Sequence, residues 1–274
     1  MKLTKNVGIP VIAVILIISF NNVRPGEAAT VSGSSQNVIW YFFKMKFWTF
    51  WFNSDAEISE IDVQISASKS ECVKGLVSKN NKKIIYLPTR VYEKFPNLIG
   101  YEIKNGVVKT IEYKHFEKLT ELQLIDLFDN YISTISNDAF KDLTKLKSLN
   151  LADNVLKSID RYTFDSVKNL RNLYLHKNQI KSVSIYAFDF LTELRNISLS
   201  NNKLESWNGD YLSENKKLEY IWLESNKIKD LNPTSFDGKS NLKYIDLQNN
   251  QCIDNFYYTA SFSSMKEKIQ ASCQ

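Results

Sequence analysis

Glycine, proline, cysteine and histidine are all scarce in this chain of 274 residues. With eight glycines and five prolines, the chain is neither collagen-like nor rich in flexible linkers. Its two histidines, His115 and His176, are far apart in sequence, and its three cysteines lack the spacing of a zinc site. A glycine-rich phosphate loop and a nucleophile motif are absent as well. The sequence therefore indicates neither an enzyme nor a bound cofactor.

The chain has one long apolar run, Val7–Phe20. It follows the basic residues Lys2 and Lys5 and precedes a small-residue site at residues 26–28. This order is typical of a secretory signal peptide, and a run of about 14 residues is shorter than the ~20 that a membrane-spanning helix needs. We therefore expect residues 1–28 to be a cleaved signal peptide rather than an anchor, and the mature protein to be secreted.

The charge of the chain is modest. The formal net charge is +5, and it falls to +3 when residues 1–28 are removed, because that segment holds three basic residues and one acidic residue. A charge of this size does not indicate nucleic-acid binding by itself.

An asparagine recurs every 24 residues without a slip, and apolar residues occupy fixed offsets around it. One unit reads Leu146-x-x-Leu149-x-Leu151-x-x-Asn154-x-Leu156-x-x-Ile159, followed by Phe164 and Val167. A fixed period of this length is the signature of a solenoid. The recurring asparagines are Asn130, Asn154, Asn178, Asn202, Asn226 and Asn250.

Each part of the unit predicts a structural role. The Leu-x-x-Leu-x-Leu spacing places alternate side chains on one side of a short strand. A buried asparagine can bond the backbone of neighbouring turns, so the asparagines are predicted to form a ladder. No unit can bury its apolar face alone, so we expect an α/β solenoid of stacked 24-residue repeats with a parallel sheet on its concave side. A phenylalanine column is predicted to fill the outer part of the core: Phe116, Phe140, Phe164, Phe188 and Phe236.

The pattern weakens at both ends of the repeat region. Gly106 stands where the first ladder asparagine is expected, and the pattern stops at Cys252. Terminal units of a solenoid must cover the core with a polar face, so degenerate ends are expected. The predicted organisation is a signal peptide at 1–28, an N-terminal extension and cap at 29–75, repeats at 76–251 and a C-terminal cap at 252–274.

Residues 38–53 fit neither the repeat nor the signal peptide. Half of this stretch is Phe, Trp or Tyr, interrupted by Lys44 and Lys46. Three interpretations remain open: an interfacial membrane segment, a hydrophobic flap over the N-terminal end of the solenoid, or translated non-coding sequence.

These residues resemble the typical extracellular class of leucine-rich-repeat proteins, over about residues 76–274. The ending, residues 249–253 followed by Cys273, is similar to the C-terminal caps of insect secreted leucine-rich-repeat proteins, a group with immune-recognition and cell-adhesion members. The resemblance implies a horseshoe-shaped repeat fold and binding of a ligand or partner, with no catalytic residues.

Three cysteines leave one without a partner in an oxidising compartment. We predict a Cys252–Cys273 disulfide, because a loop of this size is worth about 3 kcal/mol by chain entropy and the segment 263–271 can form a returning helix. Cys72 is then the odd cysteine, either a buried or incidental thiol or the link of a covalent dimer.

Two further features fall inside the repeats. Asn196-Ile197-Ser198 is a usable glycosylation sequon, and it lies on the concave strand face. Trp207, Leu212 and Lys239 depart from the repeat pattern. Local repacking is the expected result of these departures, and a bend or contact site is the alternative.

The concave face is the predicted binding surface. Its positions precede each ladder asparagine by six, four, two and one residues, because strand side chains alternate. Six acidic residues and two basic ones fall there, while lysines gather beyond the turn, as at Lys181 and Lys227. Tyr and Trp are frequent binding hot spots, although aromatic residues on a sheet can also simply pack on each other. The predicted ligand-binding residues are Phe128, Tyr174, His176, Tyr220, Trp222 and Tyr244.

Two classes of function agree with these features. The first is a secreted recognition protein that binds a neutral or basic protein or a microbial ligand, as in innate immunity. The second is an adhesion or extracellular-matrix protein. The sequence does not separate them.

Overall fold

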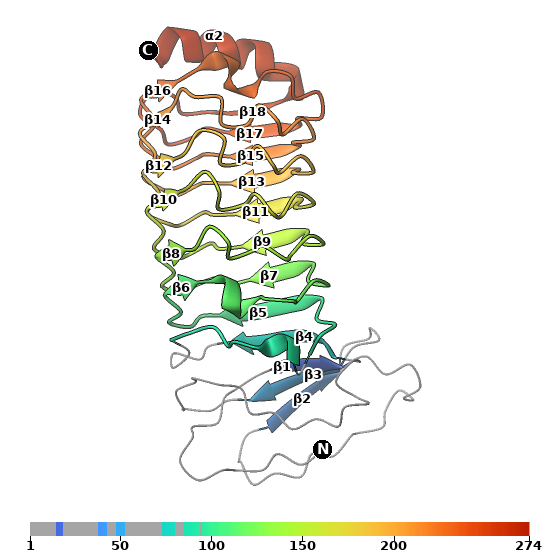
Figure 1. The fold of residues 1–274 in the computed structure, drawn as a ribbon. Helices are drawn as coiled ribbons and strands as arrows, with labels where there is room; N and C mark the ends of the chain where they lie inside the picture. The colour runs from blue at the N-terminus through green and yellow to red at the C-terminus, as the bar shows by residue number, and fades with distance from the viewer. Residues whose placement is uncertain are drawn as a thin grey trace.

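The computed structural model describes residues 85–93 and 95–273, together with four strands nearer the N-terminus. These four strands are β1 (Ile15–Ile18), β2 (Val38–Phe42), β3 (Trp48–Phe52) and β4 (Val73–Lys79). The chain forms a stack of about seven turns with one helix closing the C-terminal end (Figure 1). The predicted solenoid with 24-residue repeats is confirmed.

One side of every turn contributes a short strand to a continuous sheet. From β4 to β17 the neighbouring strands are parallel, and in the repeats the register advances by 24 residues, as from Leu149 to Leu173 to Ile197. Alternate residues of each strand enter the core, so Leu173 is buried and its neighbours are half-buried. The parallel strands after β4 are β5 (Gly100–Lys104), β7 (Leu124–Asp126), β9 (Ser148–Asn150), β11 (Asn172–Tyr174), β13 (Asn196–Ser198), β15 (Tyr220–Trp222) and β17 (Tyr244–Asp246).

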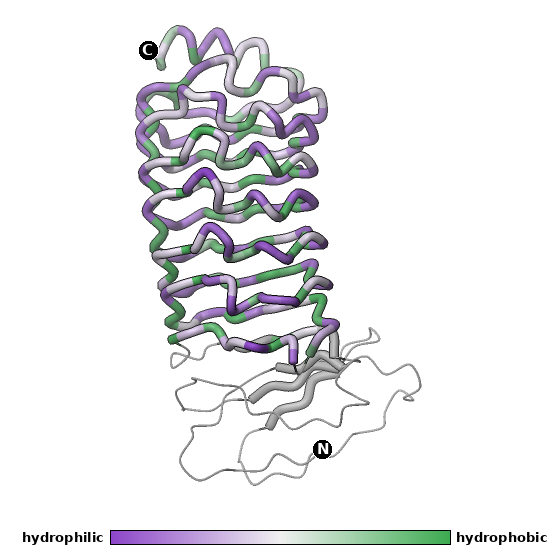
Figure 2. The backbone as a smooth tube through the Cα atoms, in the orientation of Figure 1, coloured by the Kyte–Doolittle hydropathy of each residue, from purple (hydrophilic) through white to green (hydrophobic). Residues whose placement is uncertain are grey.

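The rest of each turn is irregular, with two-residue strands and short 3-10 helices. Three parallel pairs lie outside the main sheet: β6 (Thr110–Ile111) with β8 (Thr134–Ile135), β10 (Ser158–Ile159) with β12 (Ser182–Val183), and β14 (Ser206–Trp207) with β16 (Asp230–Leu231). The 3-10 helices are η1 (Val91–Glu93), η2 (Tyr113–His115), η3 (Pro233–Phe236) and η4 (Thr259–Ser261). Figure 2 shows hydrophobic residues recurring in successive turns, as the 24-residue period requires.

The asparagine ladder holds neighbouring turns together. Asn178 donates from Nδ2 to the carbonyl oxygens of Leu151 at 2.9 Å and Leu175 at 3.0 Å, and its Oδ1 accepts from the backbone N–H of Leu156 at 3.0 Å. The other five asparagines make the equivalent bonds, so the ladder amides, buried in all but the part-buried Asn250, satisfy neighbouring backbone groups. The residue before each ladder position has a left-handed backbone, with φ between 52° and 56°: Asn105, Asp129, Asp153, Lys177, Asn201, Ser225 and Asn249.

The phenylalanine column runs through the first four repeats. Phe116, Phe140, Phe164 and Phe188 are buried and stack with successive ring centroids 6.0 to 6.2 Å apart. Leu212 interrupts the column.

The unit that contains Leu212 is packed differently from its neighbours. Trp207 is only 1% exposed, and its ring contacts that of Tyr211 at 4.6 Å. In the next unit the buried Lys239 donates to the carbonyl oxygen of Asp237 at 3.1 Å, and burial lowers the pKa of its ammonium group. These departures from the repeat are accommodated by local packing.

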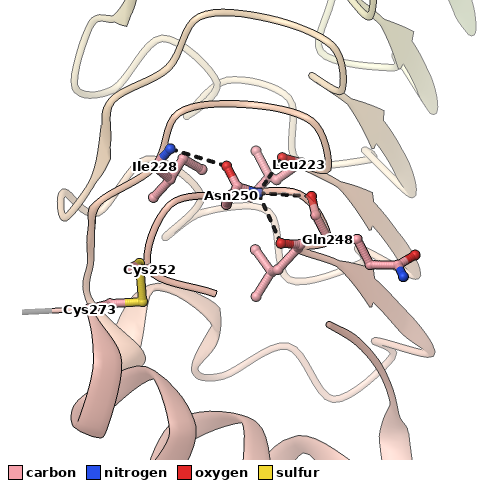
Figure 3. Close-up of a disulfide and its surroundings, with 7 residues drawn as sticks. Leu223, Ile228, Gln248, Asn250, Cys252 and Cys273 are labelled. Carbon is pink, nitrogen blue, oxygen red and sulfur yellow. Dashed lines mark hydrogen bonds between the residues drawn. A yellow bond between two sulfur atoms is a disulfide. The ribbon is translucent and has the colours of Figure 1, made fainter. Parts of the chain in front are cut away.

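The C-terminal cap consists of an antiparallel strand and a helix. Strand β18 (Phe256–Tyr258) turns back along β17, and helix α2 (Phe262–Ser272) covers the last turn with its buried Met265 and Ile269. A disulfide joins Cys252 to Cys273 beside the last ladder residue, Asn250 (Figure 3). Both ends of the cap are thereby attached to the final repeat.

The N-terminal strands extend the sheet beyond β4. Strand β1 pairs with both β4 and β3 in antiparallel fashion, and β3 pairs with β2. Because β1 falls within residues 1–28, cleavage of a signal peptide would remove it and free that edge of β4. Residues 19–37, 43–47 and 53–72 lie outside the described residues, and with them Cys72. The signal peptide, the domain limits and the fate of the Cys72 thiol stay predictions.

Candidate functional site

Five aromatic side chains lie together at the C-terminal end of the concave sheet. Tyr220, Tyr244 and Tyr258 occupy one row, because the register pairs Tyr220 with Tyr244 and Tyr244 with Tyr258. In the next row Asp246 is paired with Trp222 on one side and with Phe256 on the other. We call Tyr220, Trp222, Tyr244, Phe256 and Tyr258 the aromatic cluster.

The rings of the aromatic cluster are in mutual contact. Tyr220 stacks on Trp222 with centroids 5.7 Å apart, and Trp222 lies 6.5 Å from Tyr244. The Tyr244 ring lies 6.0 Å from that of Phe256 and 5.2 Å from that of Tyr258. Such contacts fix the rings relative to one another before any ligand arrives, which lowers the entropic cost of binding.

Sequence reasoning missed two members of this cluster. Phe256 and Tyr258 are 40% and 59% exposed, the most open positions in it. They lie beyond Cys252, where the 24-residue offset no longer applies, so the repeat could not place them. The sequence signal that could have indicated them is the aromatic run Phe256-Tyr257-Tyr258. In a strand its first and third side chains share one face, and the structure shows these two exposed and Tyr257 buried.

The other predicted ligand residues lie apart from the aromatic cluster. Tyr174 and His176 form an edge-to-face pair with centroids 6.3 Å apart. Tyr174 is separated from Trp222 by Ser198, which is buried between the two neighbouring strands. Phe128 follows β7, four strand positions from β15 in the sheet. At about 4.8 Å per strand, that is roughly 19 Å, so Phe128 belongs to a different part of the surface.

Three acidic residues in the N-terminal half of the concave face form ion pairs with lysines. Lys104 forms ion pairs with Glu102, at 3.2 Å, and with Asp126. Farther along, Lys177 lies 3.8 Å from Asp153. These ion pairs give Glu102, Asp126 and Asp153 a basic partner, while Asp129 accepts a hydrogen bond from Nδ2 of Asn105 instead.

The two acidic residues beside the aromatic cluster, Glu224 and Asp246, form no ion pair with a basic residue in the described part of the chain. Asp246 is 8% exposed, and its carboxylate accepts from the Tyr244 hydroxyl at 2.6 Å and from the Gln248 N–H at 3.1 Å. Glu224 is half-buried, and its Oε2 has no hydrogen-bond partner among the described residues. Burial raises the pKa of Glu224, and the nearby Asp246 carboxylate raises it further. Burial and the hydrogen bond to Asp246 likewise raise the pKa of Tyr244.

The two histidines have different environments. His115 is buried in η2, where its Nδ1 accepts from the Glu112 N–H at 3.0 Å, and burial lowers its pKa to about 4. His176 is half-buried on the concave face, and burial lowers its pKa as well. Within residues 85–93 and 95–273, no group of three or more His, Cys, Asp or Glu side chains could hold a metal ion.

Asn196 lies on the concave strand β13, as its offset predicts. Its Nδ2 donates to Oδ1 of Asn172 on the neighbouring strand at 2.5 Å. A glycan on this nitrogen would replace that bond and cover the middle of the sheet. Glycosylation of Asn196 stays a prediction.

The lateral edge beyond the ladder is basic and open. Lys157, Lys181, Lys227 and Lys229 are exposed there, and Lys229 lies 3.6 Å from Glu205. In addition, no helix in the described residues has both the length and the apolar character to cross a membrane.

Solved structures of leucine-rich-repeat proteins are similar to this chain. A leucine-rich-repeat protein of Leptospira interrogans superposes with a TM-score of 0.59 at 24% identity, over 66% of this chain and 44% of the other, so this chain spans less than half of that protein. A chain from an octameric complex of Latrophilin 3, Unc5D and the LRR part of FLRT2 superposes with a TM-score of 0.56 at 22% identity, over 71% and 72% of the two chains. These similarities show the shared fold.

Comparison of the sequence itself gives the family. No curated protein matches the chain. The family model for the leucine rich repeat matches residues 102–156, 144–204 and 192–252. Since these matches together cover more than half of the sequence and coincide with the turns of the solenoid, the chain belongs to the leucine-rich-repeat family.

Proposed function

We propose that this protein is a secreted recognition protein that binds a protein partner on the C-terminal part of its concave face. The observation that carries the proposal is the aromatic cluster, five contacting rings at the end of a continuous hydrogen-bonded sheet. Tyrosine and tryptophan contribute large contact areas at low entropic cost and are frequent hot spots of protein interfaces. The leucine-rich-repeat fold commonly mediates protein–protein binding, and one similar chain belongs to a multiprotein complex.

Secretion is supported by the sequence order of residues 1–28 and by the Cys252–Cys273 bond. Disulfides of this kind persist in oxidising compartments and are rare in the cytosol. The test is the mass of the purified extracellular protein. A mature chain beginning near residue 29 agrees with secretion, and a chain that retains residues 1–28 inside the cell contradicts it.

The binding surface is tested with a double substitution. A partner captured from extracellular fluid is titrated against the native protein and against the Tyr220→Ala/Trp222→Ala variant, with folding checked by circular dichroism. We expect the variant to lose about 2 kcal/mol or more of binding free energy, roughly thirtyfold in affinity.

A matched control uses the lateral edge. Lys181→Ala/Lys227→Ala alters two exposed side chains on the lateral edge, beyond the ladder and away from the concave strands, and is expected to bind the partner normally. Loss of binding in this control, together with normal binding by the Tyr220→Ala/Trp222→Ala variant, would move the binding surface to the basic edge and refute the proposal.

We further propose innate immunity as the setting, because of the resemblance of the C-terminal cap to insect secreted repeat proteins. Induction of the transcript by infection is the expected result. Constitutive expression in muscle, nerve or epidermis would instead favour the adhesion or matrix role.

A further inference from the structure

Asp246 lies at the centre of the aromatic cluster rather than at its margin. On the sheet it stands between Trp222 and Phe256, and the Tyr244 hydroxyl donates to its carboxylate. Glu224 lies two residues beyond Trp222 on the same side of the sheet, with its Oε2 buried and without a partner among the described residues. Two carboxylates are therefore surrounded by rings on a surface that is partly shielded from water.

Burying a carboxylate without a counter-ion costs free energy, and two neighbouring carboxylates repel each other. The first repeats avoid this cost because Lys104 lies between Glu102 and Asp126. No ion pair of the described residues includes Glu224 or Asp246, and Lys243, the residue just before β17, is already bound to Glu219 at 2.6 Å. The missing counter-charge is thus not supplied by the described part of the chain.

The aromatic rings also favour a positively charged group at this site. The face of an aromatic ring is negative and attracts a cation placed within about 6 Å of its centroid. The chain shows this contact at the border of the cluster, where the Lys243 ammonium lies 5.8 Å from the centroid of the Tyr220 ring. An acidic ligand would be repelled here, and a purely apolar one would bury Glu224 further without pairing it.

We propose that Glu224, Asp246 and the surrounding rings of Trp222, Tyr244 and Phe256 form a receptor for a positively charged side chain, an arginine or lysine, that the protein partner inserts. This inference rests on the proposed function and specifies the chemistry of the partner. The guanidinium or ammonium group would supply the counter-charge that the Glu224 and Asp246 carboxylates lack, while its alkyl chain packs on the rings.

The test uses small probes that need no knowledge of the partner. The full secreted protein, labelled with ¹⁵N at tryptophan, is titrated with N-acetyl-arginine methylamide and with its neutral analogue N-acetyl-citrulline methylamide. The indole N–H resonance of Trp222, assigned with a Trp222→Phe variant, reports binding. We expect a saturable shift with the arginine probe at a dissociation constant of about 1–10 mM, and about tenfold weaker binding of citrulline.

Variants separate charge from shape. Glu224→Gln keeps the size of the side chain and is expected to weaken the arginine probe about tenfold while leaving the citrulline probe unchanged. Glu102→Gln, which removes a carboxylate already paired with Lys104, is expected to change neither. Equal binding of the two probes, the absence of a saturable shift, or unchanged arginine binding by folded Glu224→Gln would each overturn the cation receptor.

The two proposals fail in different ways. If the arginine probe does not bind but Tyr220→Ala/Trp222→Ala still loses the partner, the cation receptor is wrong and the concave binding surface stands. If the arginine probe binds as expected while the double variant keeps the partner, the cluster binds a cation but the partner inserts none there, and the concave binding surface is wrong.

Discussion

The two ends of the repeat region have the same kind of interior and differ in the surface of their concave strands. Strands β5 and β7 carry Glu102 and Asp126, held by the single base Lys104. At the other end, Asp246 on β17 and Glu224, two residues after β15, lie among aromatic rings, and neither forms an ion pair with a basic residue in the described part of the chain. The backbone register and the asparagine ladder are the same at both ends. A solenoid can thus keep its core constant while each row of its surface takes on a separate chemistry.

The largest expected effect is the loss of stability when a ladder asparagine is removed, and it tests whether the two ends of the ladder contribute equally to the free energy of unfolding. Asn130→Ala and Asn226→Ala each remove an amide that bonds two carbonyl oxygens and one backbone N–H of neighbouring turns. Buried backbone groups left without partners should lower the free energy of unfolding by about 4 kcal/mol in both variants. Urea denaturation followed by circular dichroism measures this.

The control for the ladder is Asn169→Ala. Its Nδ2 also donates to a carbonyl oxygen of the preceding turn, that of Thr144 at 2.7 Å, but the bond is exposed. We expect a loss of less than about 1 kcal/mol, because water replaces the lost bond. A large cost at only one end of the ladder would show that the interiors are not equivalent.

The second test concerns the end of the chain that carries the aromatic cluster. Removing the cap disulfide with Cys252→Ser/Cys273→Ser should lower the free energy of unfolding by about 3 kcal/mol, because the loop of the unfolded chain is no longer closed. Reduction of the native protein should cause a similar loss and should leave the variant unaffected. A variant as stable as the native protein would show that packing of α2 alone holds the cap.

The third test measures how stability depends on pH because of His115, which lies in the N-terminal part of the solenoid. In the folded state the pKa of His115 lies at about 4, below its ordinary value of 6.5, so between these values the unfolded chain binds more protons. The contribution of His115 to stability is therefore complete above pH 6.5 and is lost as the pH falls toward 4. We expect this loss to reach about 2 kcal/mol by pH 4.5.

The matched variant is His115→Ala, because Ala139 and Ala187 occupy the same offset in later repeats. Its free energy of unfolding should lack the part of the pH dependence that His115 causes. Identical curves for the two proteins between pH 7 and 4.5 would contradict the burial of a neutral imidazole.

The smallest effects are expected to have opposite signs. Lys104→Met leaves Glu102 and Asp126 without their shared base and should cost about 1 kcal/mol. Glu224→Gln should instead stabilise the protein at pH 7, by roughly 0.5 kcal/mol. The folded state raises the pKa of this carboxyl, so it binds the charged form less well than the unfolded chain does. Destabilisation by both variants would remove the electrostatic contrast between the two ends.

The 24-residue period predicted most of the fold and the register of the surface. Because each unit adds one strand in phase, the sequence placed Tyr220 beside Tyr244 and Ser198 between Tyr174 and Trp222, as the structure shows. Inside a strict repeat, the offset of a residue from the ladder asparagine is enough to place it on the sheet.

The 24-residue period could not predict the structure after Cys252, where the repeat stops, or the directions of long side chains on the surface. Strand β18 returns antiparallel after Cys252, and it brings Phe256 and Tyr258 to the concave face. The ion pairs of Lys104 depend on how a long side chain extends between neighbouring strands, so the excess of acidic residues did not reveal which carboxylates lack a basic partner in the described part of the chain. The candidate site was therefore only partly visible in the sequence.

The regular step of the sheet also has a consequence for length. Tyr174 and Trp222 are separated by the single strand β13, and neighbouring strands lie about 4.8 Å apart. Because each turn contacts mainly the turns beside it, duplicating residues 194–217 would move the Tyr174–His176 pair one further step from the aromatic cluster without altering either one. For the proposed binding surface, the number of turns between two rows would therefore set the distance between the groups that a partner must present to them.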